Sequence, residues 1–131
     1  MELPKVLSLC TDPDPSTSRE RAKVLESHGF QVVSVSSALQ AEFEITMGQC
    51  GIFVSCPLFA ELFTGDLFRL FKYRCPDGLT VFVMKDEARS SVKRPQADIQ
   101  IHESYGPNGI AAAILAHLQK PIEPTDLADT A

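Results

Sequence analysis

Four cysteines have the widest chemical repertoire in this sequence, since a thiol can bind a metal, form a disulfide or act as a nucleophile. They are Cys10, Cys50, Cys56 and Cys75. None belongs to a Cys-x-x-Cys pair, and none has a histidine at the spacing of a zinc site. We therefore expect reduced thiols in or near the interior, and we predict no metal site, no disulfide and no cofactor.

Cys10, Cys56 and His102 each follow an apolar run that is typical of a strand. If the first and third strands are neighbours, Cys10 and Cys56 approach each other, and a redox switch is one interpretation. Two unconnected small apolar side chains in a reducing cytoplasm are the other, which we favour. A lone histidine at a strand end is more often a hydrogen-bonded neutral side chain than a base or a metal ligand.

Length and composition limit the classes of protein that this chain can be. Its 131 residues, 44% hydrophobic and 22% charged, suit one soluble globular domain. A net charge of −5 and a basic patch no larger than Lys93-Arg94 argue against nucleic acid as a partner. No signal-type or membrane-length apolar run is present, so we expect a cytoplasmic protein without membrane contact.

Strand and helix patterns alternate along the chain. Strands are predicted over about residues 5–10, 30–35, 51–54, 79–84 and 98–102, and helices over about residues 15–28, 38–47, 66–73 and 108–118. Asp14 and Ser37 are predicted N-caps, the latter in a capping box with Gln40. The run Gly51-Ile52-Phe53-Val54 fits a strand that helices cover on both faces. The alternation predicts an α/β fold with a doubly wound, five-stranded parallel sheet.

Two segments depart from this alternation. Residues 85–96 separate the last two strands, and they are polar, contain Pro95 and show little helical periodicity. We therefore predict a shortened or missing fourth helix. Residues 120–131 contain two prolines and little to bury, so we expect one domain over residues 1–119 and a flexible tail or linker stub over 120–131.

Several segments together resemble the receiver domain of bacterial response regulators, the CheY-like family, over about residues 4–120. They are Thr11-Asp12-Pro13-Asp14, Glu26-Ser27-His28-Gly29-Phe30-Gln31-Val32-Val33, the apolar strand ending at Ser55, and Gly65 opening a helix. The resemblance implies a flavodoxin-like sheet in strand order 2-1-3-4-5. It also implies a role in two-component signal transduction and the phosphorelay.

Receivers use five positions at the carboxyl ends of the strands: an acidic pair, an acceptor aspartate, a Ser or Thr, and a Lys. The resemblance places these positions at Cys10, Thr11, Ser55, Lys85 and His102, and all five are replaced. Serine is a poor nucleophile without a base, and Mg²⁺ needs carboxylate oxygens that Cys10 and Thr11 do not supply. We therefore predict a degenerate receiver with no catalytic residues, which is not an enzyme.

These replacements also change the charge of the pocket. The family's acids make it anionic for the cation, whereas the residues here leave it at about +1 when His102 is neutral. The Lys85 ammonium could take the place of the missing cation, paired to Asp12 or Glu103 as auxiliary groups. In the alternative, Lys85 points into solvent.

The main functional hypothesis is a pseudo-receiver that works as a phosphorylation-independent protein-interaction module. Its partner would be a histidine kinase, an output domain or a second copy of the chain in a homodimer. Receivers usually use the surface of the last two strands and their helices, and the loss of the fourth helix would make homodimerisation there differ from the family's mode.

Two alternatives stay open. Cys10 with Ser16-Thr17-Ser18 looks like the loop of the phosphotransferase component that carries phosphate on a cysteine, although Asp12 and Asp14 would repel a phosphate. The altered pocket could instead sense a small ligand.

Overall fold

The computed structural model of this chain describes residues 3–10, 14–56, 61–84 and 97–119. The strands are β1 (Val6–Cys10), β2 (Val32–Val35), β3 (Ile52–Cys56), β4 (Leu79–Met84) and β5 (Ile99–His102). The helices are α1 (Pro15–Ser27), α2 (Ala38–Met47), α3 (Glu61–Arg74), η1 (Glu103–Tyr105) and α4 (Gly106–Leu118). Strands and helices alternate from β1 to β4, and β5, a short 3-10 helix η1 and α4 follow.

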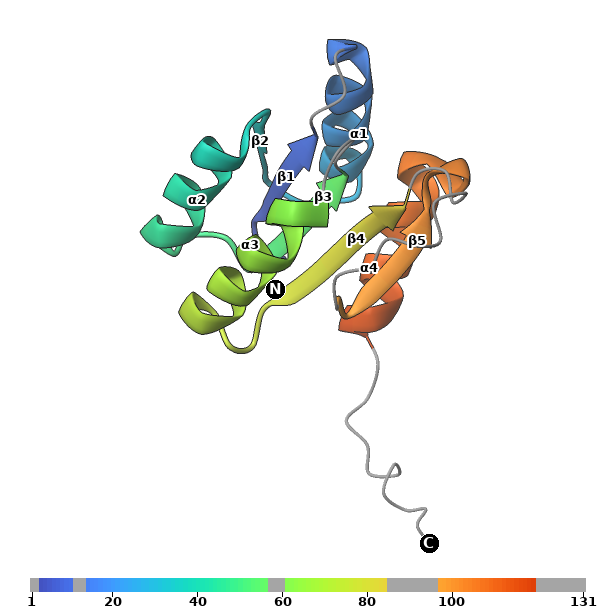
Figure 1. Cartoon of the computed structure of the whole chain (residues 1–131). Coiled ribbons are helices and arrows are strands. Elements are labelled where there is room, and N and C mark those ends of the chain that lie inside the picture. The colour runs from blue at the N-terminus through green and yellow to red at the C-terminus, as the bar shows by residue number, and fades with distance from the viewer. Residues whose placement is uncertain (1–2, 11–13, 57–60, 85–96, 120–131) are drawn as a thin grey trace, which may run out of the picture.

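All five strands lie parallel in one sheet, in the order β2-β1-β3-β4-β5 (Figure 1). β1 pairs with both β2 and β3, so the chain first builds outward to one edge and then crosses back to build the other. The doubly wound fold and strand order predicted from the sequence are confirmed.

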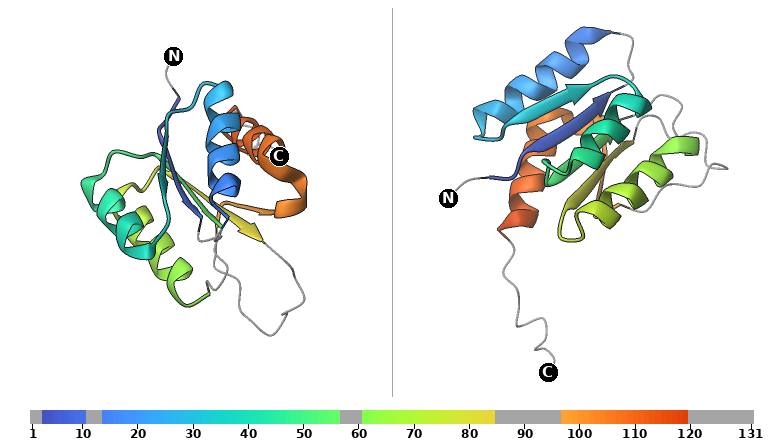
Figure 2. Two further views of the ribbon diagram at one scale, coloured as in Figure 1. Left: turned by 90° about the horizontal axis from the view of Figure 1, so that it is seen from above. Right: turned by 90° about the vertical axis from the view of Figure 1, so that its left-hand side faces the viewer.

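Helices cover both faces of the sheet, α1 and α4 on one and α2 and α3 on the other (Figure 2). Alternate residues of each central strand therefore enter two separate clusters. The cluster under α1 and α4 is mostly aliphatic and includes Leu25, Ile110 and Ile114. The cluster under α2 and α3 is rich in phenylalanine, with Phe53 edge-on to Phe68 at 5.3 Å between ring centroids. Burial on both faces explains why β3 carries a continuous apolar run.

Short polar residues begin the first two helices as expected. The Asp14 carboxylate accepts a hydrogen bond from Ser16 N at 3.0 Å, and Ser37 Oγ accepts one from Gln40 N at 3.2 Å. Gly48 ends α2 with φ of 73°, a left-handed conformation that costs glycine little. Local chemistry therefore sets these boundaries.

Two helix starts differ from the prediction. α3 begins at Glu61, so Gly65 lies inside the helix and does not open it. A glycine inside a helix costs about 1 kcal/mol, which burial of Leu67, Phe68 and Phe71 on the same helix outweighs. α4 begins at Gly106, directly after η1, and not near Asn108.

Some predictions fall on residues 85–96 and 120–131, which lie outside the described residues: the shortened fourth helix and the C-terminal tail. Among the helices that the structure describes, none is both long and apolar enough to cross a bilayer.

Candidate functional site

The carboxyl ends of the parallel strands meet at one edge of the sheet, where doubly wound folds place their sites. Cys10 ends β1 and is the pairing partner of Cys56 at the end of β3. Ser55 pairs with Leu9 on one side and with Phe82 on the other. The fold thus places Cys10 and Ser55 on adjacent strands, which are spaced about 4.8 Å apart.

Ser55 and Cys10 nevertheless face opposite sides of the sheet. Ser55 shares its face with its partner Leu9, which packs in the cluster under α2 and α3. Cys10 follows Leu9 and so points to the side of α1 and α4. The two side chains therefore do not form one site, although their backbones are adjacent.

The Ser55 hydroxyl is sealed inside the protein. Its side chain is 0% exposed, and its Oγ has no hydrogen-bond partner among the described residues. A buried hydroxyl without a partner costs roughly 1–3 kcal/mol. Without a base to remove its proton and without access from solvent, Ser55 is not poised to attack a phosphoryl group.

The His102 side chain caps the 3-10 helix η1. Its Nδ1 accepts a hydrogen bond from Ser104 N at 3.1 Å, which caps η1, and lies 3.0 Å from Ser104 Oγ. In the contact with the Ser104 amide, Nδ1 is the acceptor. His102 pairs with Met84, two strands away from Ser55, so about 10 Å of sheet separates the two backbones. The geometry favours a structural His102 over a base or a ligand.

The other predicted positions divide between described and undescribed residues. Glu103 is exposed on η1, directly after β5. Thr11, Asp12 and Lys85 lie outside the described residues, so the pairing of Lys85 with Asp12 or Glu103 stays a prediction. The same holds for a Cys10–Cys56 redox pair: the backbones are neighbours, but the Cys56 side chain is not among those described.

A magnesium site does not fit the described part of this edge. Within residues 3–10, 14–56, 61–84 and 97–119, no three His, Cys, Asp or Glu side chains come together to hold a metal ion. Cys10 offers a buried sulfur, whereas Mg²⁺ prefers oxygen ligands. Ser55 is an enclosed neutral hydroxyl.

Comparisons with known proteins agree with this architecture. No protein-family model matches the sequence, and no curated protein does. Among solved structures the fold is similar to an orphan response regulator of H. pylori, at 16% identity over 88% of this chain and 97% of that chain, with a TM-score of 0.68. It is similar to a response regulator receiver protein from Sinorhizobium medicae WSM419, at 17% identity over 86% and 90%, with a TM-score of 0.64. A CheY-like protein, tadZ, from Pseudomonas aeruginosa PAO1 matches at 15% identity over 93% and 100%, with a TM-score of 0.61. The chain has the receiver-domain fold.

Within this receiver fold, the start of α1 does not suit a cysteine-phosphate loop. The Asp14 carboxylate accepts hydrogen bonds from both the amide and the hydroxyl of Ser16, at 3.0 and 2.9 Å. A bound phosphate would need those donors and would meet a negative charge in their place. Cys10 is itself buried, so its sulfur is not presented to a phosphate donor.

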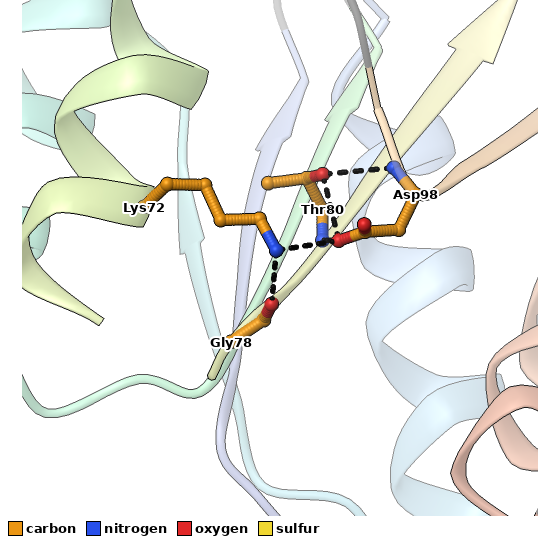
Figure 3. Close-up of polar contacts among 4 residues, drawn as sticks. All are labelled: Lys72, Gly78, Thr80 and Asp98. Atoms are coloured by element: carbon orange, nitrogen blue, oxygen red, sulfur yellow. Dashed lines mark hydrogen bonds and ion pairs between the residues drawn. The ribbon is translucent and has the colours of Figure 1, made fainter. Parts of the chain in front are cut away.

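A polar cluster of Lys72, Gly78, Thr80 and Asp98 lies at the opposite, amino edge of the sheet, where sequence patterns gave no signal (Figure 3). Asp98 Oδ2 accepts hydrogen bonds from Thr80 N at 2.9 Å and from Thr80 Oγ1 at 3.1 Å. Lys72 Nζ lies 2.9 Å from the same oxygen and donates to Gly78 O at 2.7 Å. These contacts join α3, the start of β4 and the residue before β5.

The electrostatics of Asp98 follow from these contacts. Partial burial by itself raises the pKa of the carboxyl group, but the hydrogen bonds from Thr80 and the ammonium of Lys72 outweigh it. The pKa of Asp98 therefore lies below its ordinary value. The cluster links α3, β4 and the residue before β5 at the amino edge of the sheet, and we therefore interpret it as structural.

Cys50 is a second perturbed group away from the carboxyl edge. Burial raises the pKa of its thiol above the ordinary value, and the nearby Glu44 and Cys75 act in the same direction against Lys5. The thiol therefore stays protonated near neutral pH and is a weak nucleophile.

Proposed function

We propose that this chain is a degenerate receiver domain that acts in two-component signalling as a phosphorylation-independent protein-interaction module. The observation that carries the proposal is the fully buried, unbonded hydroxyl of Ser55, at the position that the receiver resemblance assigns to the acceptor. It is not an enzyme in this proposal. Its partner is a histidine kinase, an output domain or a second copy of the chain.

The chemistry of phosphoacceptors supports this choice. An acceptor carboxylate is already deprotonated and reaches solvent, while a metal ion neutralises the charge on the phosphoryl oxygens. Ser55 would have to lose a proton without a base and reach the surface from a packed cluster of phenylalanine and leucine side chains. The described residues also offer no set of oxygen ligands for the metal. In this proposal the chain keeps the fold and lacks the features that phosphoryl control needs.

Intact-mass spectrometry after incubation with acetyl phosphate and Mg²⁺ tests the loss of phosphotransfer. We expect no gain of mass, in the native chain or in Ser55→Ala. A stoichiometric phosphoryl adduct that disappears in Ser55→Ala would overturn the proposal.

Thermal unfolding with and without beryllium fluoride and Mg²⁺ tests whether the pocket still responds to a phosphoryl analogue. A ligand that binds only the folded state raises the midpoint, by an amount set by its concentration relative to its Kd. We expect no shift here, whereas a receiver that has its acceptor aspartate should shift in the same buffer. Light scattering of the same samples should show self-association unchanged by the analogue. A rise in midpoint or a change in oligomeric state would identify a responsive receiver.

A further inference from the structure

The outward face of α2 carries a row of large apolar side chains. Leu39 is 75% exposed, Phe43 61% and Met47 51%, and they follow one another at intervals of four residues. At about 100° per residue they lie opposite the buried side chains of Ala41 and Ile45. We call Leu39, Phe43 and Met47 the α2 stripe. None of them contributes to the core, so folding alone does not explain three adjacent exposed apolar residues.

A shallow groove continues this surface toward the edge of the sheet. It has a volume of about 430 Å³, and Leu39 and Phe43 form one wall of it. Val33 and Val35 of the edge strand β2 also line it, as does Glu44 of α2. Ser34 and Gln40 also line the groove, so it joins apolar walls from α2 and β2 with polar groups beside the stripe.

Carboxylates border the stripe on both sides. On the helical wheel, Glu42 lies about 60° to one side of the stripe's nearest edge and Glu44 about 60° to the other. Residues Ala38–Met47 include no lysine or arginine, and no ion pair of Glu42 or Glu44 is present among the described residues. Arg74 of α3 contacts the end of α2, where its Nη2 donates to Thr46 O at 2.8 Å. The surface is therefore apolar along its centre and acidic along both margins.

We propose that the α2 stripe and its groove bind a basic amphipathic helix of a partner protein. This inference rests on the proposed function and names the surface that carries it. A helix that lays an apolar row into a groove uses anchors at the same spacing as the stripe, and lysine or arginine beside those anchors would meet Glu42 and Glu44. A second copy fits less well, since a two-fold contact through the stripe would bring the acidic margins of both copies together.

A synthetic peptide provides the probe. It would be a fluorescein-labelled helix of about four turns, with leucine along one face and lysine on both flanks, titrated by fluorescence anisotropy. Phe43→Ser should weaken binding about tenfold, because most of a phenylalanine contact is lost. Leu39→Ser should act in the same direction. Tyr73→Ser removes an 80% exposed aromatic side chain from α3 and should leave the affinity unchanged.

The charge of the margins is tested separately. Glu42→Gln with Glu44→Gln should weaken binding several-fold at low salt, and the difference from the native chain should vanish near 0.5 M salt, where the screening length is only about 4 Å. A peptide with glutamate in place of lysine should bind much more weakly, and so should one with two central prolines. Equal binding of the acidic or proline peptide, or no effect of Phe43→Ser, would overturn the proposal. Because the replaced side chains are exposed, circular dichroism of each variant should match that of the native chain.

Two further measurements separate this proposal from its alternatives. If sedimentation shows a dimer that Phe43→Ser dissociates, the stripe binds a second copy, and the assignment to a basic helix is wrong. Repeating the peptide titration with beryllium fluoride and Mg²⁺ separates the surface from the proposed function. A several-fold change in affinity would contradict phosphorylation independence while leaving the surface in place, whereas absent peptide binding together with absent analogue response would refute only the surface.

Discussion

Lys72 Nζ lies 2.9 Å from Asp98 Oδ2, so a single oxygen joins the last turn of α3 to the residue that precedes β5. The same oxygen accepts hydrogen bonds from the amide and the hydroxyl of Thr80. Three donors converge on one carboxylate at the amino edge of the sheet.

Asp98→Asn should lower the free energy of unfolding by about 1–2 kcal/mol. The amide can still accept from Thr80, but it loses the charge that strengthens the bonds to Thr80 and Lys72. Chemical denaturation measures the change. Asp66→Asn is the matched control, because Asp66 pairs with Arg69 on the exposed surface and such pairs contribute little. An equal loss of unfolding free energy in the two variants would mean that the three donors to Asp98 add no more stability than an exposed ion pair.

The same carboxylate predicts a pH dependence. Its folded pKa lies below its ordinary value, and an unfolded aspartate titrates near about 3.9. Its contribution is therefore complete above that pH and is lost as pH falls toward the folded pKa. The stability difference between the native chain and Asp98→Asn should be constant from about pH 5 to 7 and shrink below about pH 4. A difference that grows on acidification would contradict the direction of the shift.

Ser55→Ala should leave stability unchanged or raise it slightly, because it removes a buried hydroxyl without a hydrogen-bond partner. Ser55→Asp should destabilise by about 3 kcal/mol or more, since it places an unpaired carboxyl group in a fully enclosed site. Thermal and chemical unfolding give both values. Ser8→Ala is a useful companion, as Ser8 is equally enclosed and unpaired on the other face. A well-folded Ser55→Asp with native stability would show that the pocket accepts a carboxylate after all.

Arg21→Met should stabilise the protein by about 1–3 kcal/mol. Arg21 is buried on α1, and its Nε and Nη1 have no hydrogen-bond partner among the described residues. Replacing a buried guanidinium that has two unsatisfied nitrogens with an apolar chain of similar reach removes its desolvation cost. Arg19→Met, on the exposed side of the same helix, should change stability by less than about 0.5 kcal/mol. A destabilised Arg21→Met would indicate that the guanidinium has a compensating contact in solution.

Local patterns predicted most of the fold because they act over a few residues. The boundaries at Asp14, Ser37 and Gly48 follow from capping chemistry, and the apolar run ending at Val54 follows from a strand covered on both faces. The predicted start of α3 was wrong. A helix can continue through Gly65 when its later turns pack well, and that packing is a tertiary effect.

The candidate site was harder to predict for a related reason. Counting along strands placed Cys10 and Ser55 at one edge, but the pleat sends their side chains to opposite faces. The contact of Lys72 with Asp98 joins residues far apart in sequence, and no hydrophobic periodicity predicts it. The α2 stripe did have a signal, since Leu39, Phe43 and Met47 recur every four residues, yet only the structure shows that this row faces away from the core.

The placement of the aromatic side chains also determines how this protein can be observed. The sequence has no tryptophan, and Tyr73 and Tyr105 are both largely exposed, whereas the phenylalanines of the core emit weakly. Native fluorescence therefore reports almost nothing about the interior, because both tyrosines are already exposed to water in the folded state. A tryptophan introduced as Phe43→Trp would be the chain's single indole, positioned on the α2 stripe. Its emission would shift to the blue when a partner covers the stripe and would respond little to anything else.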